Sequence, residues 1–221
     1  MRRGRLASPD ASLRRRLRRA RPQLPWPRLL RRHGRHRPGA GRREDFALAG
    51  HSMGGRVAML IAATVPRRVR RLALLDTAAH LPTSAEAERR LGLIALGDRD
   101  GIEAVIQEWL PPMIAPDRLG DAALWDASAA MIRRAGLESL RSQQKALLER
   151  PDGFAHLDTV KVPTAFIVGA LDVWSPVEGH VEMQAHVAGS TLTVIEDCGH
   201  MAPTEDPEAV NRALAAWLER A

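Results

Sequence analysis

A serine lies between glycines in the run Gly50-His51-Ser52-Met53-Gly54, which matches the spacing G-x-S-x-G. That spacing is typical of a sharp turn between a strand and a helix, where a strained backbone exposes the serine hydroxyl at the start of the helix. The flanking positions are glycines because side chains there would clash in so tight a turn. A serine hydroxyl becomes a good nucleophile only when a neighbouring base takes its proton. The run therefore predicts acyl-transfer chemistry, provided that the chain also supplies a base and an acid.

Downstream of Ser52, an acid and a histidine each follow an apolar run that is typical of a buried strand. Asp172 comes first and His200 second, so the chain order is serine, acid, histidine. A histidine can serve as the base, and an acid then holds its tautomer and stabilises its cationic form. Glu196 and Asp197 are the nearest alternatives to Asp172. The order is the one expected for a Ser-His-Asp triad on an α/β sheet.

The elements that must position these residues are those of an α/β fold. From residue 44 onward, apolar runs alternate with helical patterns, which is typical of βα units and a mostly parallel sheet. The expected strands span residues 45–50, 71–76, 164–169 and 191–196, and the expected helices beside them span 53–65 and 207–220. Parallel strands end at one common edge, where ligand sites of such sheets lie. We therefore expect Ser52, Asp172 and His200 to meet there.

A helical insertion separates the second expected strand from the third. Four helical stretches fill it, at about residues 84–97, 100–110, 121–135 and 137–149. Gly136 and Pro151 stand where helix ends belong. An insertion at this point in a parallel sheet covers the carboxyl edge, so we expect a helical lid over about residues 78–160.

The segment from about residue 44 to 221 resembles the α/β-hydrolase family, in particular its lid-bearing esterases and lactonases. Three motifs match in order and context. The resemblance implies that Ser52 is the nucleophile, Asp172 the triad acid and His200 the general base. It also implies that the backbone N–H of Met53 is one oxyanion donor and that the reaction needs no cofactor. The expected substrate is a small carboxylic ester or lactone, with carbon–carbon bond hydrolysis left open because it uses the same three residues.

Other side chains have weaker claims to the site. We expect His51 to be a pocket wall rather than a catalyst. The tryptophans Trp109, Trp125 and Trp174 are expected to line an apolar acyl pocket, although such aromatics are as often simply core. Cys198 is expected to be a small buried hydrophobic residue rather than a reactive thiol.

The sequence also departs from the family pattern. Members of the family have several strands before the nucleophile strand, and a loop after an early strand, often with a His-Gly pair, gives the second oxyanion donor. Here the pair His33-Gly34 lies too close to Ser52 to belong to that loop, because a parallel crossover takes a dozen or more residues. We therefore expect the N-terminal half of the sheet to be missing, and expect weak activity and an unpaired strand edge in consequence.

The first 43 residues form a basic leader that needs a separate argument. They hold 16 arginines against the single acid Asp10, a net charge of +15, whereas the remainder carries −8. Long helices are broken by Pro22, Pro25, Pro27 and Pro38, and the apolar positions are too few for a core. The leader could be a disordered tail, the product of a wrong reading frame or start in a GC-rich gene, or an arm for nucleic acid, membranes or targeting. It does not decide the function, and nucleic acid is not an expected partner.

Composition excludes several other classes. The single cysteine permits neither an intramolecular disulfide nor a cysteine-built zinc site, so we expect a reducing cytoplasm and no metal. No apolar run approaches the length that crosses a bilayer. The second hypothesis, from a different class, is a non-catalytic hydrolase fragment or pseudoenzyme, which could act as a binding module through the basic leader. The substrate and the oligomeric state cannot be predicted from this sequence.

Overall fold

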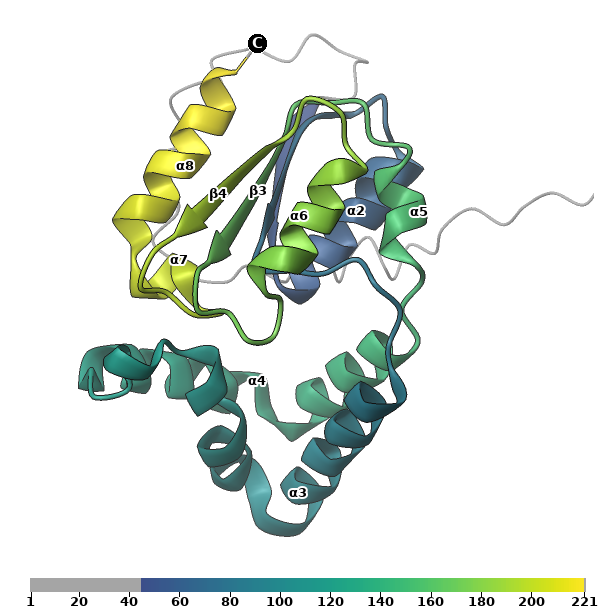
Figure 1. Cartoon of the computed structure of the whole chain (residues 1–221). Helices are drawn as coiled ribbons and strands as arrows, with labels where there is room; N and C mark the ends of the chain where they lie inside the picture. The colour runs from purple at the N-terminus through teal and green to yellow at the C-terminus, as the bar shows by residue number, and fades with distance from the viewer. Residues whose placement is uncertain (1–44, 221) are drawn as a thin grey trace, which may run out of the picture. The chain divides into compact units, whose positions relative to one another are not determined.

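Four parallel strands form one sheet in the computed structural model, which describes residues 45–220 (Figure 1). The strands are β1 (Phe46–His51), β2 (Val69–Leu75), β3 (Thr164–Gly169) and β4 (Thr191–Ile195). They lie in the order β1-β2-β3-β4, and every neighbouring pair is parallel. Every residue of β3 is buried, as expected for a parallel strand that is covered on both faces. The predicted α/β fold is confirmed.

Helices cover both faces of this sheet. Helices α2 (Met53–Thr64), α5 (Gly153–Leu157) and α6 (Val177–Ala185) lie on one face, and α8 (Pro207–Glu219) lies on the other (Figure 1). The short helix α7 (Ala202–Glu205) precedes α8. The buried Met59 of α2 and Met183 of α6 pack in one core cluster with Phe166 of β3. On the other face, the indole of Trp217 donates a hydrogen bond of 3.2 Å to the carbonyl of Pro163. Strand β1 and helix α2, which flank Ser52, thus belong to a sheet that is packed on both faces.

The lid consists of two long helices inserted between β2 and β3, and the strands point toward it (Figure 1). They are α3 (Ser84–Trp109) and α4 (Ala122–Leu148), joined by the 3₁₀ turns Pro111–Met113 and Pro116–Arg118. Helical geometry is broken in α3 at Gly101 and in α4 at Gly136, so the sequence pattern of four shorter helices was correct. The helices pack on each other through Ile106, Leu124 and their neighbours.

One arginine joins the two ends of the lid. Arg150 donates two hydrogen bonds to the carboxylate of Glu86, at 2.8 and 2.6 Å. It also donates to the carbonyl of His80, before α3, and to that of Leu147, in the last turn of α4. Both chain segments that connect the lid to the sheet are therefore held at one point.

Strand β3 has the predicted bounds, and the bounds of the other three strands differ from the predicted ones by at most two residues. Helices α5, α6 and α7 were not predicted. Helix α6 has a weak apolar pattern because its buried residues include the polar His180 beside Met183. The described residues all belong to one compact unit. The predictions for the basic leader and for His33-Gly34 concern residues outside the described part of the chain.

Candidate active site

Ser52 occupies the turn between β1 and α2 in a strained conformation, with φ 52° and ψ −120°. The turn is so tight that a Cβ at Gly50 would lie 2.2 Å from the carbonyl oxygen of Gly54. The backbone of Ser52 is also bound to the neighbouring strand segment: its N–H donates to Leu75 at 2.9 Å, and its carbonyl accepts from the hydroxyl of Thr77 at 2.7 Å. A positive φ in a non-glycine residue is rare and is typical of functional turns. The serine is thus fixed by its own turn and by β2.

His200 follows β4 and reaches Ser52 from the other side. Its Nε2 lies 2.8 Å from Ser52 Oγ, and its Nδ1 lies 2.8 Å from Asp172 Oδ2. The imidazole is only 5% exposed, and the Asp172 carboxyl is fully buried. The structure therefore brings the three residues into one hydrogen-bonded row.

Asp172 is held as an anion. Its Oδ1 accepts hydrogen bonds from the backbone N–H groups of Trp174 and Ser175, at 2.8 and 2.9 Å. Burial alone would raise the pKa of Asp172, but the hydrogen bond and the charge of His200, together with these N–H groups, lower the pKa below its ordinary value. A charged carboxylate at this place fixes the imidazole with a proton on Nδ1, which leaves Nε2 free to accept the serine proton.

Glu205, which sequence reasoning missed, supports the loop that carries His200. Its Oε1 accepts from the N–H groups of Gly199 and Met201, at 3.0 and 3.1 Å, and its Oε2 accepts from Ala115 N–H at 2.8 Å. The side chain of Met201 belongs to the apolar cluster of the lid. The histidine loop and the joint between the two lid helices are thus tied together by one buried carboxylate.

Asp76 and His51 lie behind this row. Asp76 is fully buried at the end of β2, and its Oδ1 accepts from Gly169 N–H at 2.8 Å. Burial raises its pKa well above the ordinary value, which favours the neutral acid. His51 Nε2 lies 2.7 Å from the carbonyl of His200, and desolvation, followed by the nearby His200, lowers the pKa of His51 to about 4. Both groups support the triad loops without touching the serine hydroxyl.

Thr77 is held by a second histidine. His180 is fully buried; its Nε2 accepts from Thr77 N–H at 3.2 Å, while its Nδ1 lies 3.2 Å from the carbonyl of Pro176. Burial lowers the pKa of His180, which favours the neutral ring with the proton on Nδ1. His180 therefore helps to position Thr77, whose hydroxyl donates a hydrogen bond to the carbonyl of Ser52.

A cavity of about 140 Å³ opens onto Ser52 and His200, and Met53 lines it as well. Met53 is the first residue of α2, where backbone N–H groups have no acceptor within the helix. A second, larger cavity of about 780 Å³ adjoins the first. The residues that line both are Glu86, Arg89, Arg90, Trp109 and Trp174. The space beside Ser52 thus has a small inner part at the serine and a wide outer part lined by residues of the lid helices.

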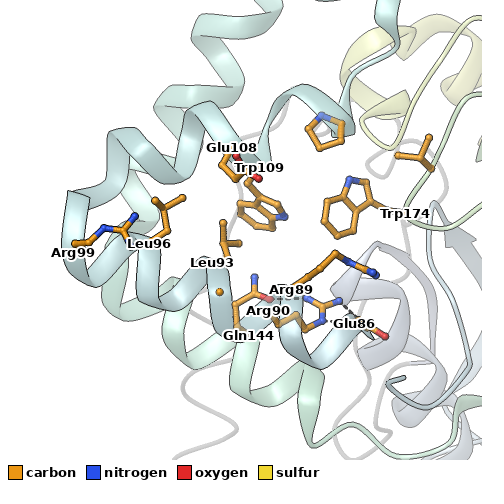
Figure 2. Close-up of a pocket in the computed structure, with 13 residues that line it drawn as sticks. Glu86, Arg89, Arg90, Leu93, Leu96, Arg99, Glu108, Trp109, Gln144 and Trp174 are labelled. Carbon is orange, nitrogen blue, oxygen red and sulfur yellow. Dashed lines mark hydrogen bonds and ion pairs between the residues drawn. The ribbon is translucent and has the colours of Figure 1, made fainter. Parts of the chain in front are cut away.

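The two shared tryptophans come from different parts of the chain. Trp109 ends α3 and Trp174 comes two residues after Asp172, and in Figure 2 their rings lie near each other at the cavity. Trp125 was predicted to line the pocket, but it packs in the apolar cluster of the lid and lines neither cavity. His51 also lines neither of them. The sequence gives the element on which each of these residues lies but not the side to which its side chain points.

No metal site accompanies this arrangement. Among residues 45–220, no three His, Cys, Asp or Glu side chains are grouped so that they could hold a metal ion. Cys198 is buried, and burial raises the pKa of its thiol to about 12, so it is no thiolate nucleophile. In the same described range, no helix has both the length and the apolar character of a membrane span.

The sheet, the serine turn and the hydrogen-bonded row together define an α/β fold with the geometry of a serine hydrolase. The sequence model described as the alpha/beta hydrolase family matches residues 3–213. The chain belongs to this family.

Named relatives agree with that assignment. The (E)-2-((N-methylformamido)methylene)succinate hydrolase of Acinetobacter baylyi is 30% identical over 78% of this chain and 64% of its own length. The pimeloyl-[acyl-carrier protein] methyl ester esterase of Aromatoleum aromaticum is 30% identical over 75% of this chain and 70% of its own. The first alignment therefore spans less than two thirds of the relative.

Solved structures show the same fold. A thermophilic esterase from Thermogutta terrifontis superposes with a TM-score of 0.74 and 30% identity, over 79% of this chain and 65% of that one. The enol-lactonase from Burkholderia xenovorans gives a TM-score of 0.70 with 23% identity, over 80% and 66%. At that identity the second likeness supports the fold alone.

Proposed function

We propose that this protein is a serine hydrolase that cleaves a small carboxylic ester or lactone, with Ser52 as nucleophile, His200 as base and Asp172 as the acid. The observation that carries the proposal is the row of two 2.8 Å contacts from Asp172 through His200 to a strained serine. Esterase activity in two 30% identical relatives supports the substrate class. The single cysteine, which permits no intramolecular disulfide, supports a cytoplasmic location.

The reaction would proceed in two halves. Ser52 Oγ attacks the carbonyl carbon while its proton passes to His200 Nε2, and the N–H of Met53 donates to the oxygen that becomes negative. The bond between the carbonyl carbon and the leaving-group oxygen then breaks, and His200 gives the proton to the leaving-group oxygen. In the second half, water attacks the acyl-serine, again losing its proton to His200. Ser52 Oγ departs with that proton, and the free acid is released.

Carbon–carbon bond hydrolysis is the second candidate activity. The relatives include 2-hydroxy-6-oxononadienedioate/2-hydroxy-6-oxononatrienedioate hydrolase of Klebsiella pneumoniae, 24% identical to this chain. Since both reactions use the same base and nucleophile, the choice of substrate separates them. Aryl esters and unsaturated ketoacids assayed side by side would assign the bond that is cleaved.

Two measurements test the role of Ser52. Turnover of short aryl esters is expected to fall by roughly 10⁴-fold or more in Ser52→Ala and in His200→Ala. A fluorophosphonate should label the wild-type chain at Ser52, as located by peptide mass spectrometry. The exposed lid serine gives the control, because Ser84→Ala should label and turn over normally. Equal turnover in Ser52→Ala and wild type, or labelling at another residue, would refute the role of Ser52. The absence of both turnover and labelling in wild type would favour the non-catalytic alternative.

A further inference from the structure

The inner cavity beside Ser52 is lined by an excess of positive charge. Three arginines, Arg56, Arg89 and Arg90, face it, whereas Glu86 is the one carboxylate among the residues that line it. A pocket for a purely apolar acyl group has no need of guanidinium groups. Arg56 and Arg90 are partly removed from water, which is unfavourable unless they meet an acceptor, whereas Arg89 is exposed and keeps its donors available. The excess positive charge of this cavity therefore points to a substrate that carries a negative charge.

Glu86 cannot balance that charge, because its carboxylate is already saturated. Arg150 binds it through two hydrogen bonds, and Arg90 Nε donates to its Oε1 at 2.8 Å. Burial would raise the pKa of Glu86, but these two arginines lower it to about 2. The cluster of Arg90, Arg150 and Glu86 has two guanidinium groups and one carboxylate, so its net charge is positive. Arg56 and Arg89 add to that positive charge.

Of these three arginines, Arg89 is the one whose guanidinium has no partner in the described part of the chain. Arg90 donates to Gln144 as well as Glu86, and Arg56 donates to the carbonyl of His80. Within residues 45–220, by contrast, Arg89 makes neither a hydrogen bond nor an ion pair. Figure 2 shows it extending from α3 toward Trp174, at the boundary that the two cavities share. Its fork of N–H groups is thus open toward the substrate space.

We propose that Arg89, backed by Arg56 and Arg90, binds a carboxylate group of the substrate, so that the natural substrate is an ester or lactone that carries a free acid. The proposal rests on the proposed function, which it narrows to anionic substrates. A guanidinium binds a carboxylate through two parallel hydrogen bonds, and the Arg150–Glu86 pair shows that geometry in the same cluster. The tryptophans Trp109 and Trp174 would cover the carbon chain between the two ends.

Charged groups of the outer cavity are placed so that they do not compete. Glu108 lines the outer cavity only, and its carboxylate disfavours an anion there. Arg99 also lines only the outer cavity, and it is bound to Asp100 at 2.7 Å. The anionic end of a substrate is therefore directed to Arg89 rather than to the outer lid.

Equilibrium binding tests the site without any turnover. Tryptophan fluorescence of Ser52→Ala would be titrated with glutarate, with the isosteric neutral glutaramide, and with inorganic phosphate. Glutarate is expected to bind roughly 10- to 100-fold more tightly than glutaramide, as for a charge-assisted hydrogen bond. Arg89→Gln should abolish that preference. Arg134→Gln, an exposed lid arginine that lines neither cavity, should keep it. Equal binding of glutarate and glutaramide, tighter binding of phosphate, or an unchanged preference in Arg89→Gln would overturn the proposal.

Turnover then separates this proposal from the proposed function. The aryl monoester of glutarate is compared with the aryl ester of glutaramic acid and with the aryl ester of 4-(trimethylammonio)butanoate. In wild type the anionic ester should have a kcat/KM roughly 10- to 100-fold above the neutral one, and Arg89→Glu should prefer the cationic ester. If Ser52→Ala stops all turnover but kcat/KM is equal for the three esters, the hydrolase stands and the carboxylate site fails. If glutarate binds through Arg89 but no ester is turned over, the function fails and the anion site stands.

Discussion

Glu205 gives the sharpest test of how the active site is held together. In Glu205→Gln the carboxylate becomes an amide of nearly the same shape, so one acceptor oxygen is replaced by a donor. The three N–H groups of Gly199, Met201 and Ala115 then face one oxygen and one NH₂ group. At least one buried N–H loses its acceptor, and the remaining bonds lose the assistance of the charge.

The size of the effect follows from those bonds. A hydrogen bond to a charged group contributes about 1.5–3 kcal/mol, and a buried donor left unpaired costs about 1–3 kcal/mol. For Glu205→Gln we expect a loss of stability of about 2–4 kcal/mol, which for a chain of this length lowers Tm by roughly 4–16 °C. Because Glu205 Oε1 holds both residues that flank His200, the imidazole should also shift. A displacement near 1 Å lowers kcat by roughly 100-fold.

Thermal unfolding and aryl-ester kinetics measure the two effects separately. Glu208→Gln is the matched control, because Glu208 is exposed in the first turn of α8 and the same charge is removed three residues away. It should melt and turn over like wild type. A Glu205→Gln protein with wild-type Tm and kcat would refute the reasoning. A lowered Tm with unchanged kcat would show that Glu205 stabilises the lid joint but does not position His200.

Three further outcomes are expected. Asp76→Asn should raise Tm at pH 8 and leave Tm unchanged near pH 3. The pKa of Asp76 is raised in the folded protein, so its ionised form becomes destabilising as pH rises. A Tm below that of wild type at pH 8 would contradict this. Gly50→Ala should lose fluorophosphonate labelling, since its Cβ would meet the carbonyl of Gly54 at 2.2 Å; labelling at the wild-type rate would refute the tight turn. Glu86→Gln should cost stability above pH 4.5, and the gap to wild type should shrink as pH falls toward 2, because the lowered pKa makes Glu86 stabilising only when ionised; a gap independent of pH in chemical denaturation would argue against it.

The sequence was informative wherever a short local pattern decides the structure. The strand before Ser52, the glycines around it and the two helix breaks are each set by neighbours a few residues apart, and all were predicted within one or two residues. Asp172 and His200 could be singled out because each follows a strand of the parallel sheet, and parallel strands bring their ends together. The parallel order of the strands therefore brings the residues that follow β1, β3 and β4 to one edge of the sheet.

The rest depends on contacts between distant residues. Glu205 accepts from Ala115, 90 positions away, and Arg90 reaches Gln144, 54 positions away. Nothing near either residue in the sequence indicates those partners. The arginine pair at positions 89 and 90, with Glu86 four residues before Arg90, was a signal on the predicted lid, but a helical face with mixed charge is usually solvent-exposed. For Trp125, the sequence cannot distinguish a tryptophan that packs in the apolar cluster of the lid from one that lines a cavity.

The junction at Arg150 has a consequence for how such proteins diversify. One guanidinium holds the segments that leave and rejoin the sheet, through Glu86, His80 and Leu147. Everything between these points can change in length or shape while the two ends stay at a fixed separation, and a long insertion adds little closure entropy. The lid could therefore be replaced by another helical insertion without a change in the sheet. A lid transplanted with its own Glu86–Arg150 pair should bring a new substrate preference to an unchanged triad, whereas one grafted without the pair should leave both segments loose.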